Sequence, residues 1–552
     1  MTGDAAAISE NGHPSYLVNT GKYQGIRAWI FSTDHKRIGI LYLIALISFF
    51  AVGVSFGFLI RLELLTPGKT IVDAQTYNEF FTLHGIIMIF LFVIPGLPAV
   101  FGNFFLPIMV GAKDVAFPRL NLLSWYMYVS GGLLVLLSIL LPGGPADTGW
   151  TFYIPYSVRT QTNVLLTLFA AFLLGFSSIL TGLNFVTTIH RLRAPGMGWF
   201  KMPLFIWSVY ATAWIQILAT PIIGITLLLI VIERVFGVGL FDPALGGDPV
   251  LYQHLFWIYS HPAVYIMIVP AMGVISEIIP VFSHRTIFGY KFIAFSSIGI
   301  ALFGSLVWAH HMFVAGMSES GQFIFSLLTF LVAIPSAIKV FNWTATLYKG
   351  SIELEPPLLY ALAFIFLFSI GGLTGVMQGA LSVDIQVTDT AFIVGHFHYV
   401  MFGGTGFGIF AALHYWLPKM FGRMYNIKVA KVAFWILFIG FNTLYFPMFV
   451  MGWLGMPRRY YDYLPQYQPY HIISTVGSWI LITGLIIMFA NLIKSLRSGP
   501  VVKENNIWGG ETLEWTIATP PTHENFEHIP IITEAPYEYK INDEPVPEEE
   551  VK

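Results

Sequence analysis

The sequence predicts an all-α membrane protein with twelve transmembrane helices. Of its 552 residues, 56% are hydrophobic and only 11% are charged, about half the charged fraction of a typical soluble protein. Mean hydropathy is +0.71. A spanning helix needs roughly 20 apolar residues. Twelve such runs occur, at about 38–62, 80–106, 121–141, 162–190, 203–235, 251–282, 288–316, 321–348, 357–381, 390–416, 428–452 and 470–494.

The segments that flank these runs are polar. Residues 1–37 lack an apolar core before a small-residue cleavage site, so we expect an N-terminal segment without a removable signal peptide. Residues 498–552 are acidic and contain several prolines, which predicts a peripheral C-terminal extension. The twelve-helix domain is therefore expected to occupy residues 38–497.

Composition excludes several kinds of site and partner. The chain has no cysteine, which rules out disulfides, thiolate-bound metal centres and covalent heme attachment through CxxCH. The net charge of −2 predicts no nucleic-acid partner.

Lysine and arginine indicate the orientation, because the cytoplasmic loops of membrane proteins are enriched in both. An even number of spans places both termini on one side of the membrane. With that side cytoplasmic, it holds 21 of the 28 lysines and arginines and the outer side holds six, while Lys339 lies inside a span. We therefore expect both termini to be cytoplasmic.

Histidines inside the predicted spans are the strongest indication of function, because imidazole in the hydrocarbon region is costly unless it is paired or binds a ligand. Six of the fifteen histidines lie at least four residues from either end of a run: His84, His261, His310, His311, His396 and His398. The predicted topology puts all six in one layer between mid-membrane and the outer surface. A single such histidine is readily satisfied by a carbonyl group, but six favour metal or heme ligation.

Spacing divides the six histidines into sets. His396 and His398 are two apart, about 200° around a helix, so they face opposite sides and cannot bind one metal together. His84 and His398 suit the two axial positions of a low-spin heme, and His396 suits the single axial position of a second heme. His310 and His311 are about 100° apart and can share a metal with a third ligand.

That third ligand is expected to be His261, because three imidazoles suit copper when thiolate is absent. Tyr265 lies one helical turn after His261, on the same helix face. A phenol beside a redox metal is a plausible source of an electron and a proton. The fold is therefore expected to enclose two hemes and one copper.

Several strings closely resemble subunit I of the heme–copper oxidases, the terminal respiratory oxidases. They are WIYSHPAVY at 257–265, WAHHMF at 308–313, GHFHYV at 395–400, FTLHG at 81–85, MPRRYYDY at 456–463 and the FGNFFLP to FPRLN region at 101–121. The resemblance runs from about residue 28 to 525, with the motifs in the family's order.

The resemblance implies a role for each matching residue. His84 and His398 correspond to the low-spin heme ligands, and His396 to the ligand of the high-spin heme. His261, His310 and His311 correspond to the ligands of the active-site copper, CuB, with Tyr265 the tyrosine that is covalently linked to His261. Heme contacts are implied for Arg458, Arg459 and Trp150 near the propionates, and for Arg61 near the formyl group of an a-type low-spin heme.

The resemblance also implies two proton pathways from the cytoplasm. One contains Lys339, Ser336, Ser276 and Tyr265. The other begins at Asp114 and continues through Asn103, Asn121, Ser177, Ser178 and Asn184. Lys339 is the one cation at least four residues from either end of a predicted span, which itself indicates function because a buried charge there does not favour stability.

Two departures from the family pattern stand out. Ala263 occupies the position where many members have a proton-donating glutamate, and we expect Tyr259 and Ser260 with bound water to replace it, as in the subgroup with YSHP. Thr388 and Asp389 stand where the family commonly has His-Asp, which leaves Asp389 as a weak candidate ligand for magnesium or manganese. Glu63 and Gly68 are an equally weak indication of a calcium site.

The sequence thus predicts the catalytic subunit of a cytochrome c oxidase, reducing O2 to water with protons taken from the cytoplasm. The resemblance implies proton pumping and residence in a bacterial inner membrane. Without cysteine the chain cannot carry the dinuclear copper CuA, so we expect a subunit II with CuA, a subunit III, and cytochrome c or another c-type heme donor. Quinol oxidase is the alternative within the superfamily, followed by nitric oxide reductase, whose non-heme iron site normally adds glutamates. A twelve-helix solute transporter explains only the number of spans.

Overall fold

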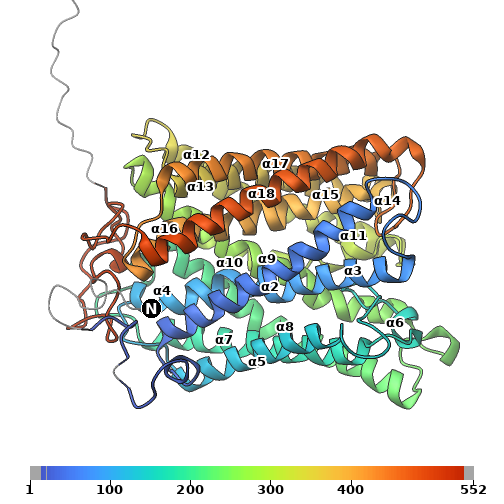
Figure 1. The fold of residues 1–552 in the computed structure, drawn as a ribbon, viewed down its shortest axis with the longest axis horizontal. Helices are drawn as coiled ribbons and strands as arrows, with labels where there is room; N and C mark the ends of the chain where they lie inside the picture. Colours follow the sequence, from blue (N-terminus) through green and yellow to red (C-terminus); the bar gives the residue numbers. More distant parts are fainter. Residues whose placement is uncertain (1–13, 20, 540–552) are drawn as a thin grey trace, which may run out of the picture.

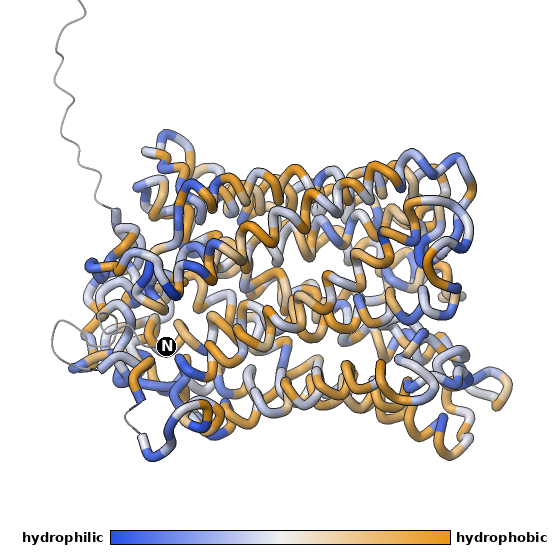
Figure 2. The backbone as a smooth tube through the Cα atoms, viewed as in Figure 1, coloured by the Kyte–Doolittle hydropathy of each residue, from blue (hydrophilic) through white to orange (hydrophobic). Residues whose placement is uncertain are grey.

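The computed structural model describes residues 14–19 and 21–539. They form one bundle of long helices that run side by side, with loops and short helices at both ends (Figure 1). Hydrophobic residues dominate the middle of the bundle and hydrophilic residues gather at its two ends (Figure 2). This distribution is the one a membrane-spanning protein requires, because the hydrocarbon layer excludes unpaired polar groups.

Eleven helical stretches of the described residues are long and apolar enough to cross a membrane. Seven are single helices: α2 (His35–Glu63), α5 (Pro118–Leu137), α7 (Val164–Arg191), α8 (Leu204–Phe236), α9 (Pro249–Ser283), α13 (Pro356–Gly379) and α17 (Ile427–Trp453). Four are composite: α3 (Ala74–Ile86), η2 (Ile87–Val93), η3 (Gly96–Gly102) and α4 (Asn103–Met109); α11 (Glu319–Leu331) and α12 (Ala333–Leu347); α15 (Ala391–Val400), η7 (Met401–Gly406) and α16 (Phe407–Phe421); and η8 (Pro465–Tyr467) with α18 (Gln468–Ser498).

The expected span at 288–316 is not one continuous helix. It consists of α10 (Tyr290–Gly304) followed by the 3₁₀ turn η6 (Trp308–Met312). The ring of Tyr265 packs against Gly304, where an added Cβ would lie 2.3 Å from Tyr265 Cε2. The regular helix ends at this contact, and the following tight turn carries His310 and His311.

Short helices and turns complete the described chain. They are α1 (Arg27–Ile30), α6 (Tyr156–Arg159), α14 (Leu381–Val387), η4 (Trp199–Lys201), η5 (Pro243–Leu245) and η9 (Leu513–Trp515). β-Type pairing within the described part of the chain is limited to three isolated bridges, Ser15 with Thr522, Thr390 with Pro457 and Arg423 with Val501.

Two of the histidine-bearing helices change to π-helical geometry beside their histidines. Segment η2 begins three residues after His84, and η7 begins three residues after His398. π-Helical turns are rare and frequently occur at functional sites. Here they widen the helix next to the residues expected to bind heme.

The C-terminal extension packs against the end of the bundle where the N-terminal residues also lie (Figure 1). Tyr537 donates a hydrogen bond to Glu277 in α9 at 2.5 Å and accepts one from the Leu204 N–H at 2.7 Å. Lys36, at the start of α2, donates to the side chain of Asn525 at 2.8 Å. Trp515 is 1% exposed. The extension therefore closes this end of the bundle, with buried side chains of its own.

Candidate functional site

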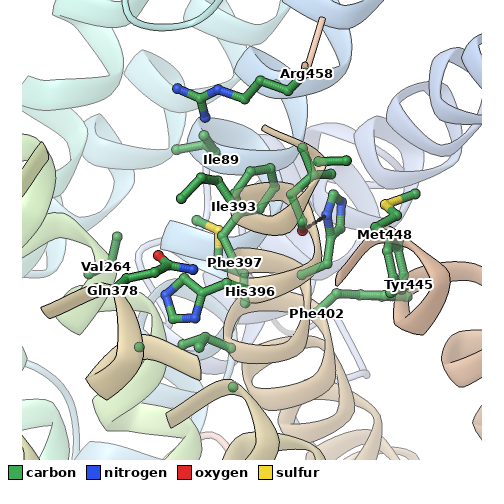
Figure 3. A pocket seen from close by; sticks show the side chains of 18 of the residues that line it. Ile89, Val264, Gln378, Ile393, His396, Phe397, Phe402, Tyr445, Met448 and Arg458 are labelled. Carbon is green, nitrogen blue, oxygen red and sulfur yellow. Dashed lines mark hydrogen bonds between the residues drawn. The ribbon is translucent and has the colours of Figure 1, made fainter. Parts of the chain in front are cut away.

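All six intramembrane histidines line one cavity of about 990 Å³. They come from α3, α9, η6 and α15, four segments that are distant in the sequence. Figure 3 shows His396 with Gln378 and Val264 on one side of this pocket, Tyr445 and Met448 on the other, and Arg458 reaching across one edge. The six histidines singled out in the sequence thus share one cavity.

His84 and His398 face each other across part of the cavity. Their ring centroids are 6.5 Å apart and their planes differ by 28°. A metal ion with an imidazole nitrogen about 2 Å away on each side would separate the centroids by roughly 6 to 6.5 Å. Each Nδ1 is held by a carbonyl at 2.8 Å, that of Gly53 for His84 and that of Val394 for His398. These bonds leave both Nε2 atoms free to bind an iron.

Glycines in neighbouring helices make room for the histidine rings. A Cβ at Gly57 in α2 would lie 2.9 Å from His84 Cε1, and a Cβ at Gly375 in α13 would lie 2.9 Å from His396 Cε1. Nδ1 of His396 lies 3.1 Å from the Thr374 hydroxyl, so its Nε2 remains available as a single axial ligand. These close approaches fix the planes of both rings.

His261, His310 and His311 form a three-imidazole cluster whose ligand atoms all lie within 4.8 Å of one another. Nδ1 of His261 is 2.9 Å from Nε2 of His311, and Nδ1 of His310 lies 3.0 Å from the Thr329 hydroxyl. The ring of His311 stacks on Trp257 at 3.7 Å. Three converging imidazoles held by second contacts suit a copper ion.

Tyr265 lies beside this cluster. Its hydroxyl is 2.8 Å from Nε2 of His261, on the side of the ring away from His311. The helical register predicted from the sequence therefore brings the phenol and imidazole into direct contact. The phenol also lines the cavity.

The residues expected near heme substituents surround the rest of the cavity. Arg458, Arg459, Trp150 and Arg61 all line it. Arg61 donates to the His471 carbonyl at 3.0 Å and to the Thr475 hydroxyl at 3.2 Å, while its buried Nε has no protein partner. Burial and the adjacent positive charge of Arg458 lower the pKa of Arg459 to about 10. An anionic group between the two guanidinium groups would relieve that repulsion.

Both carboxylates considered as cation ligands are committed to other contacts. Asp389 Oδ1 accepts two hydrogen bonds from Arg458, at 2.9 and 2.6 Å. Glu63 accepts backbone N–H bonds from Thr70, Ile71 and Val72 at 2.7–3.0 Å. Glu63 therefore fixes the loop after α2, and Asp389 fixes Arg458.

Lys339 belongs to α12, is 1% exposed and faces α10. Its Nζ donates to the Ser297 hydroxyl at 2.8 Å and to the Ile293 carbonyl at 3.1 Å. Ser336 and Tyr265 line the cavity, as that pathway requires. Ser276 does not contact Lys339 directly, because its hydroxyl accepts from Trp343 Nε1 at 2.9 Å. Ser297 could not be selected from the sequence, since a serine in an apolar span usually bonds to its own helix.

The second group of polar residues is predicted to form a column from Asp114 into the bundle. Burial, with the nearby Asp34 carboxylate, raises the pKa of Asp114 to about 7. Asn121 is fully buried, and neither polar atom of its amide has a protein partner; the same is true of Asn103 Oδ1. Asn184 instead holds the Phe117 backbone, with bonds of 2.9 and 3.1 Å. These bonds hold the segment before α5 against α7.

Farther along this column, Tyr42 connects two serines. Its hydroxyl donates to Ser124 at 2.9 Å and lies 3.2 Å from Ser177. Ser177 and Ser178 line a second, small cavity. Tyr42 and Ser124 could not be selected from the sequence because only the packing of α2, α5 and α7 brings them to Ser177. Tyr259 and Ser260 are buried in α9, at 2% and 1% exposure.

The fold and the site define a class of protein, an integral membrane enzyme that binds metal centres with buried imidazoles. Comparisons with known proteins specify it further. Residues 37–480 match the family model described as cytochrome c and quinol oxidase polypeptide I. The chain is 43% identical over 512 residues to cytochrome c oxidase subunit 1 of Thermostichus vulcanus, covering 93% of this chain and 92% of that protein. It is 44% identical over 521 residues to cytochrome c oxidase subunit 1 of Synechocystis sp., covering 94% of each.

A solved structure shares the fold. A chain of a heme–copper terminal oxidase dimer superimposes with a TM-score of 0.74 over 86% of each chain, at 23% identity. The protein therefore belongs to the heme–copper oxidase subunit I family. It is the catalytic subunit of a terminal oxidase and a homologue of cytochrome c oxidase subunit 1. The family implies hemes and CuB, and the histidine triad fits the copper.

Proposed function

We propose that this chain reduces dioxygen to water between a copper held by His261, His310 and His311 and a high-spin heme held by His396. His84 and His398 hold the low-spin heme that delivers electrons. The observation that carries this assignment is the facing pair His84 and His398 at 6.5 Å, with His396 on the same helix turned to the other side. When bound, the two hemes and the copper supply the electron transfer and the oxygen binding.

Tyr265 is the residue of this chain that can donate both an electron and a proton to the reaction. Its hydroxyl lies 2.8 Å from His261 Nε2, which supports the covalent His261–Tyr265 link implied by the family. Nδ1 of His261 lies 2.9 Å from Nε2 of His311, on the side of the ring away from Tyr265, and so remains available for the copper. The phenol is thus held beside the site where oxygen reacts.

Arginines and an aromatic side chain orient the hemes. Arg458 and Arg459 bind the propionates, with Trp150 beside them. All three side chains line the cavity, which supports this arrangement. The unpartnered Nε of Arg61 fits a formyl oxygen, which supports a-type heme. Asp389 holds Arg458 and Glu63 holds the loop after α2, in preference to binding magnesium, manganese or calcium.

Protons enter from the cytoplasm by two routes. One passes Lys339, Ser297 and Ser336 to Tyr265. The other begins at Asp114 and ends at Tyr259 and Ser260, which replace the glutamate of many relatives and place this chain in the Tyr-Ser subgroup. We assign the tail-bearing end of the bundle to the cytoplasm of a bacterial inner membrane, on the bias in lysine and arginine. Proton pumping accompanies oxygen reduction.

The wider assembly follows from the absence of cysteine. A subunit II with CuA receives electrons from cytochrome c or another c-type donor and passes them to the low-spin heme, and subunit III completes the complex.

Within the chain, residues 38–497 form the oxidase domain between cytoplasmic segments 1–37 and 498–552. The names of the relatives support cytochrome c as the donor.

Oxygen consumption by the purified complex tests the proposal, with reduced cytochrome c and then quinol as donor, each with and without cyanide. We expect cyanide-sensitive uptake driven by cytochrome c. Uptake with quinol alone would keep the chemistry and overturn the proposed donor. A preparation that retains its hemes but consumes no oxygen with either donor would overturn the proposal, and nitric oxide would be the next substrate to test.

A further inference from the structure

The route from Asp114 has an unassigned section between the serines of α7 and Tyr259 of α9. Helix α8 lies between these two helices and packs extensively against both. It carries four polar residues at four-residue intervals, Ser208, Thr212, Gln216 and Thr220, and all are at most 3% exposed. A spacing of four places them on one face of the helix.

Buried polar atoms without protein partners occur in all three helices of this section. They are Ser178 Oγ in α7, Gln216 Oε1 and Thr220 Oγ1 in α8, and Ser260 Oγ in α9. Buried polar groups in native proteins are nearly always satisfied, so each unsatisfied group requires an explanation. Four in these three helices indicate a path that contains water.

A cavity of about 30 Å³ lies where this section begins. Ser177, Ser178 and Thr181 line one part of it, Tyr42 another, and Gln216 a third. A cavity needs roughly 10–15 Å³ to hold one water molecule, so this one has room for about two. Its polar wall supplies the hydrogen-bond partners that such waters need.

Glycines in α7 bring the α8 residues close. A Cβ at Gly182 would lie 3.3 Å from Gln216 Oε1, and a Cβ at Gly175 would lie 3.4 Å from Thr220 Cγ2. On its other side, Thr220 is within interaction range of the Tyr259 phenol. Gln216 therefore sits at the cavity, and Thr220 sits one turn farther along, at Tyr259.

We propose that Gln216 and Thr220 of α8 connect the Asp114 route to Tyr259 and Ser260. Gln216 positions water through its amide oxygen. Thr220 relays the proton, accepting one on its hydroxyl oxygen while its own passes on toward Tyr259. The step moves a proton along hydrogen bonds and needs no electron donor or acceptor. This inference rests on the proposed function and extends it, because neither residue was part of the predicted pathway.

Matched substitutions separate a proton relay from simple packing. Thr220→Val keeps the shape and removes the hydroxyl, while Thr220→Ser restores it. Gln216→Met removes the amide, and Gln216→Glu retains an oxygen at the same place. Thr226→Val is the control, because Thr226 lies on the same helix and its hydroxyl is already bonded to the Ile222 carbonyl at 2.8 Å.

The experiment uses the complete oxidase in proteoliposomes, with pumped protons and oxygen consumption measured together and Asp114→Asn alongside. A positioned side chain typically accelerates proton transfer by at least roughly a hundredfold, so we expect Thr220→Val to lose pumping and at least tenfold in turnover. Thr220→Ser and Thr226→Val should behave as wild type. A cryo-EM structure provides a readout independent of activity: ordered water should lie between Ser178 and Gln216 in the wild type and be displaced in Gln216→Met.

The outcomes distinguish the inference from the function on which it rests. If wild type pumps and Asp114→Asn does not, while Thr220→Val and Gln216→Met are normal, the inference is overturned and the oxidase function stands. Equal losses in Thr220→Ser and Thr220→Val would also overturn it, since packing would then be the cause. If the wild-type complex retains its hemes but consumes no oxygen, the proposed function itself fails.

Discussion

Gly57→Ala tests whether His84 is a heme ligand held in place by the packing of α2. The new methyl group would lie 2.9 Å from His84 Cε1 and 3.1 Å from its Nδ1. Because ordinary carbon contacts begin near 3.4 Å, the ring must move by about 0.5 Å. That movement strains the 2.8 Å bond from Nδ1 to the Gly53 carbonyl.

The expected magnitude follows from these contacts. Overpacking and a weakened hydrogen bond together cost about 1–3 kcal/mol. Such a cost lowers the affinity for a ligand of His84 by roughly 5- to 150-fold. We therefore expect purified Gly57→Ala oxidase to lose low-spin heme absorbance and total heme, with the high-spin heme retained.

Two other glycine substitutions serve as matched controls. Gly375→Ala places a methyl group 2.9 Å from His396 Cε1 and should disturb the high-spin heme instead. Gly224→Ala, in α8 and outside the lining of the cavity, brings the added Cβ no closer than 3.8 Å to another residue and should leave both hemes unchanged. The assay is the absorbance spectrum with heme content per chain. A normal low-spin signal in Gly57→Ala, or equal losses in all three variants, would refute the reasoning.

Three further predictions concern protons and the C-terminal extension. The pKa of Asp114 is about 7, so its protonated form is lost as the pH rises through 7. Turnover of the wild type should therefore fall across this pH range, whereas Asp114→Asn should be slow at every pH. A wild-type profile flat from pH 6 to 9 would contradict this. Lys339→Met should abolish most turnover. Ser297→Ala should reduce turnover less, because Lys339 keeps its bond to the Ile293 carbonyl. Unchanged turnover in Lys339→Met would exclude the proton route through Lys339. Tyr537→Phe removes a hydrogen bond to buried Glu277. It should destabilise the complex by about 1–3 kcal/mol in thermal unfolding, and Tyr539→Phe is the control. An unchanged melting temperature in Tyr537→Phe would show that the extension is not held by this bond.

The histidine site could be predicted from the sequence because its physical requirements are local. Each histidine lies in a long apolar run, and a two-residue spacing on a helix fixes opposite directions for His396 and His398. The register of Tyr265 with His261 is likewise set by one helical turn, and the 2.8 Å contact confirms it. None of these inferences needed knowledge of how the helices pack.

Features that depend on packing between helices could not be predicted. The span expected at 288–316 breaks after Gly304 because a ring from another helix occupies that position. Ser297 reaches Lys339 from α10, and Ser276 is bonded to Trp343. The bonds between the Asn184 amide and the Phe117 backbone likewise depend on how α7 packs against the start of α5. A polar residue in a sequence shows that a partner is needed without identifying the partner.

The C-terminal extension shows the same limit. Its composition predicted a peripheral segment, but Glu514, Trp515 and Tyr537 are all at most 1% exposed. Burial raises the pKa of Glu514 to about 7. An acidic, proline-bearing sequence cannot reveal such docking, because the apolar surface that receives it belongs to α8, α9 and α16.

Carbon monoxide binding to the reduced complex tests the central claim most directly, because of the two hemes it can bind only one whose iron has an open position. Two hemes per chain are expected, one closed by His84 and His398 and one held by His396 alone. The reduced-minus-oxidised and CO difference spectra should therefore show one of the two hemes binding carbon monoxide. Binding to both hemes, or to neither in a preparation that retains its hemes, would contradict the assignment of the six histidines.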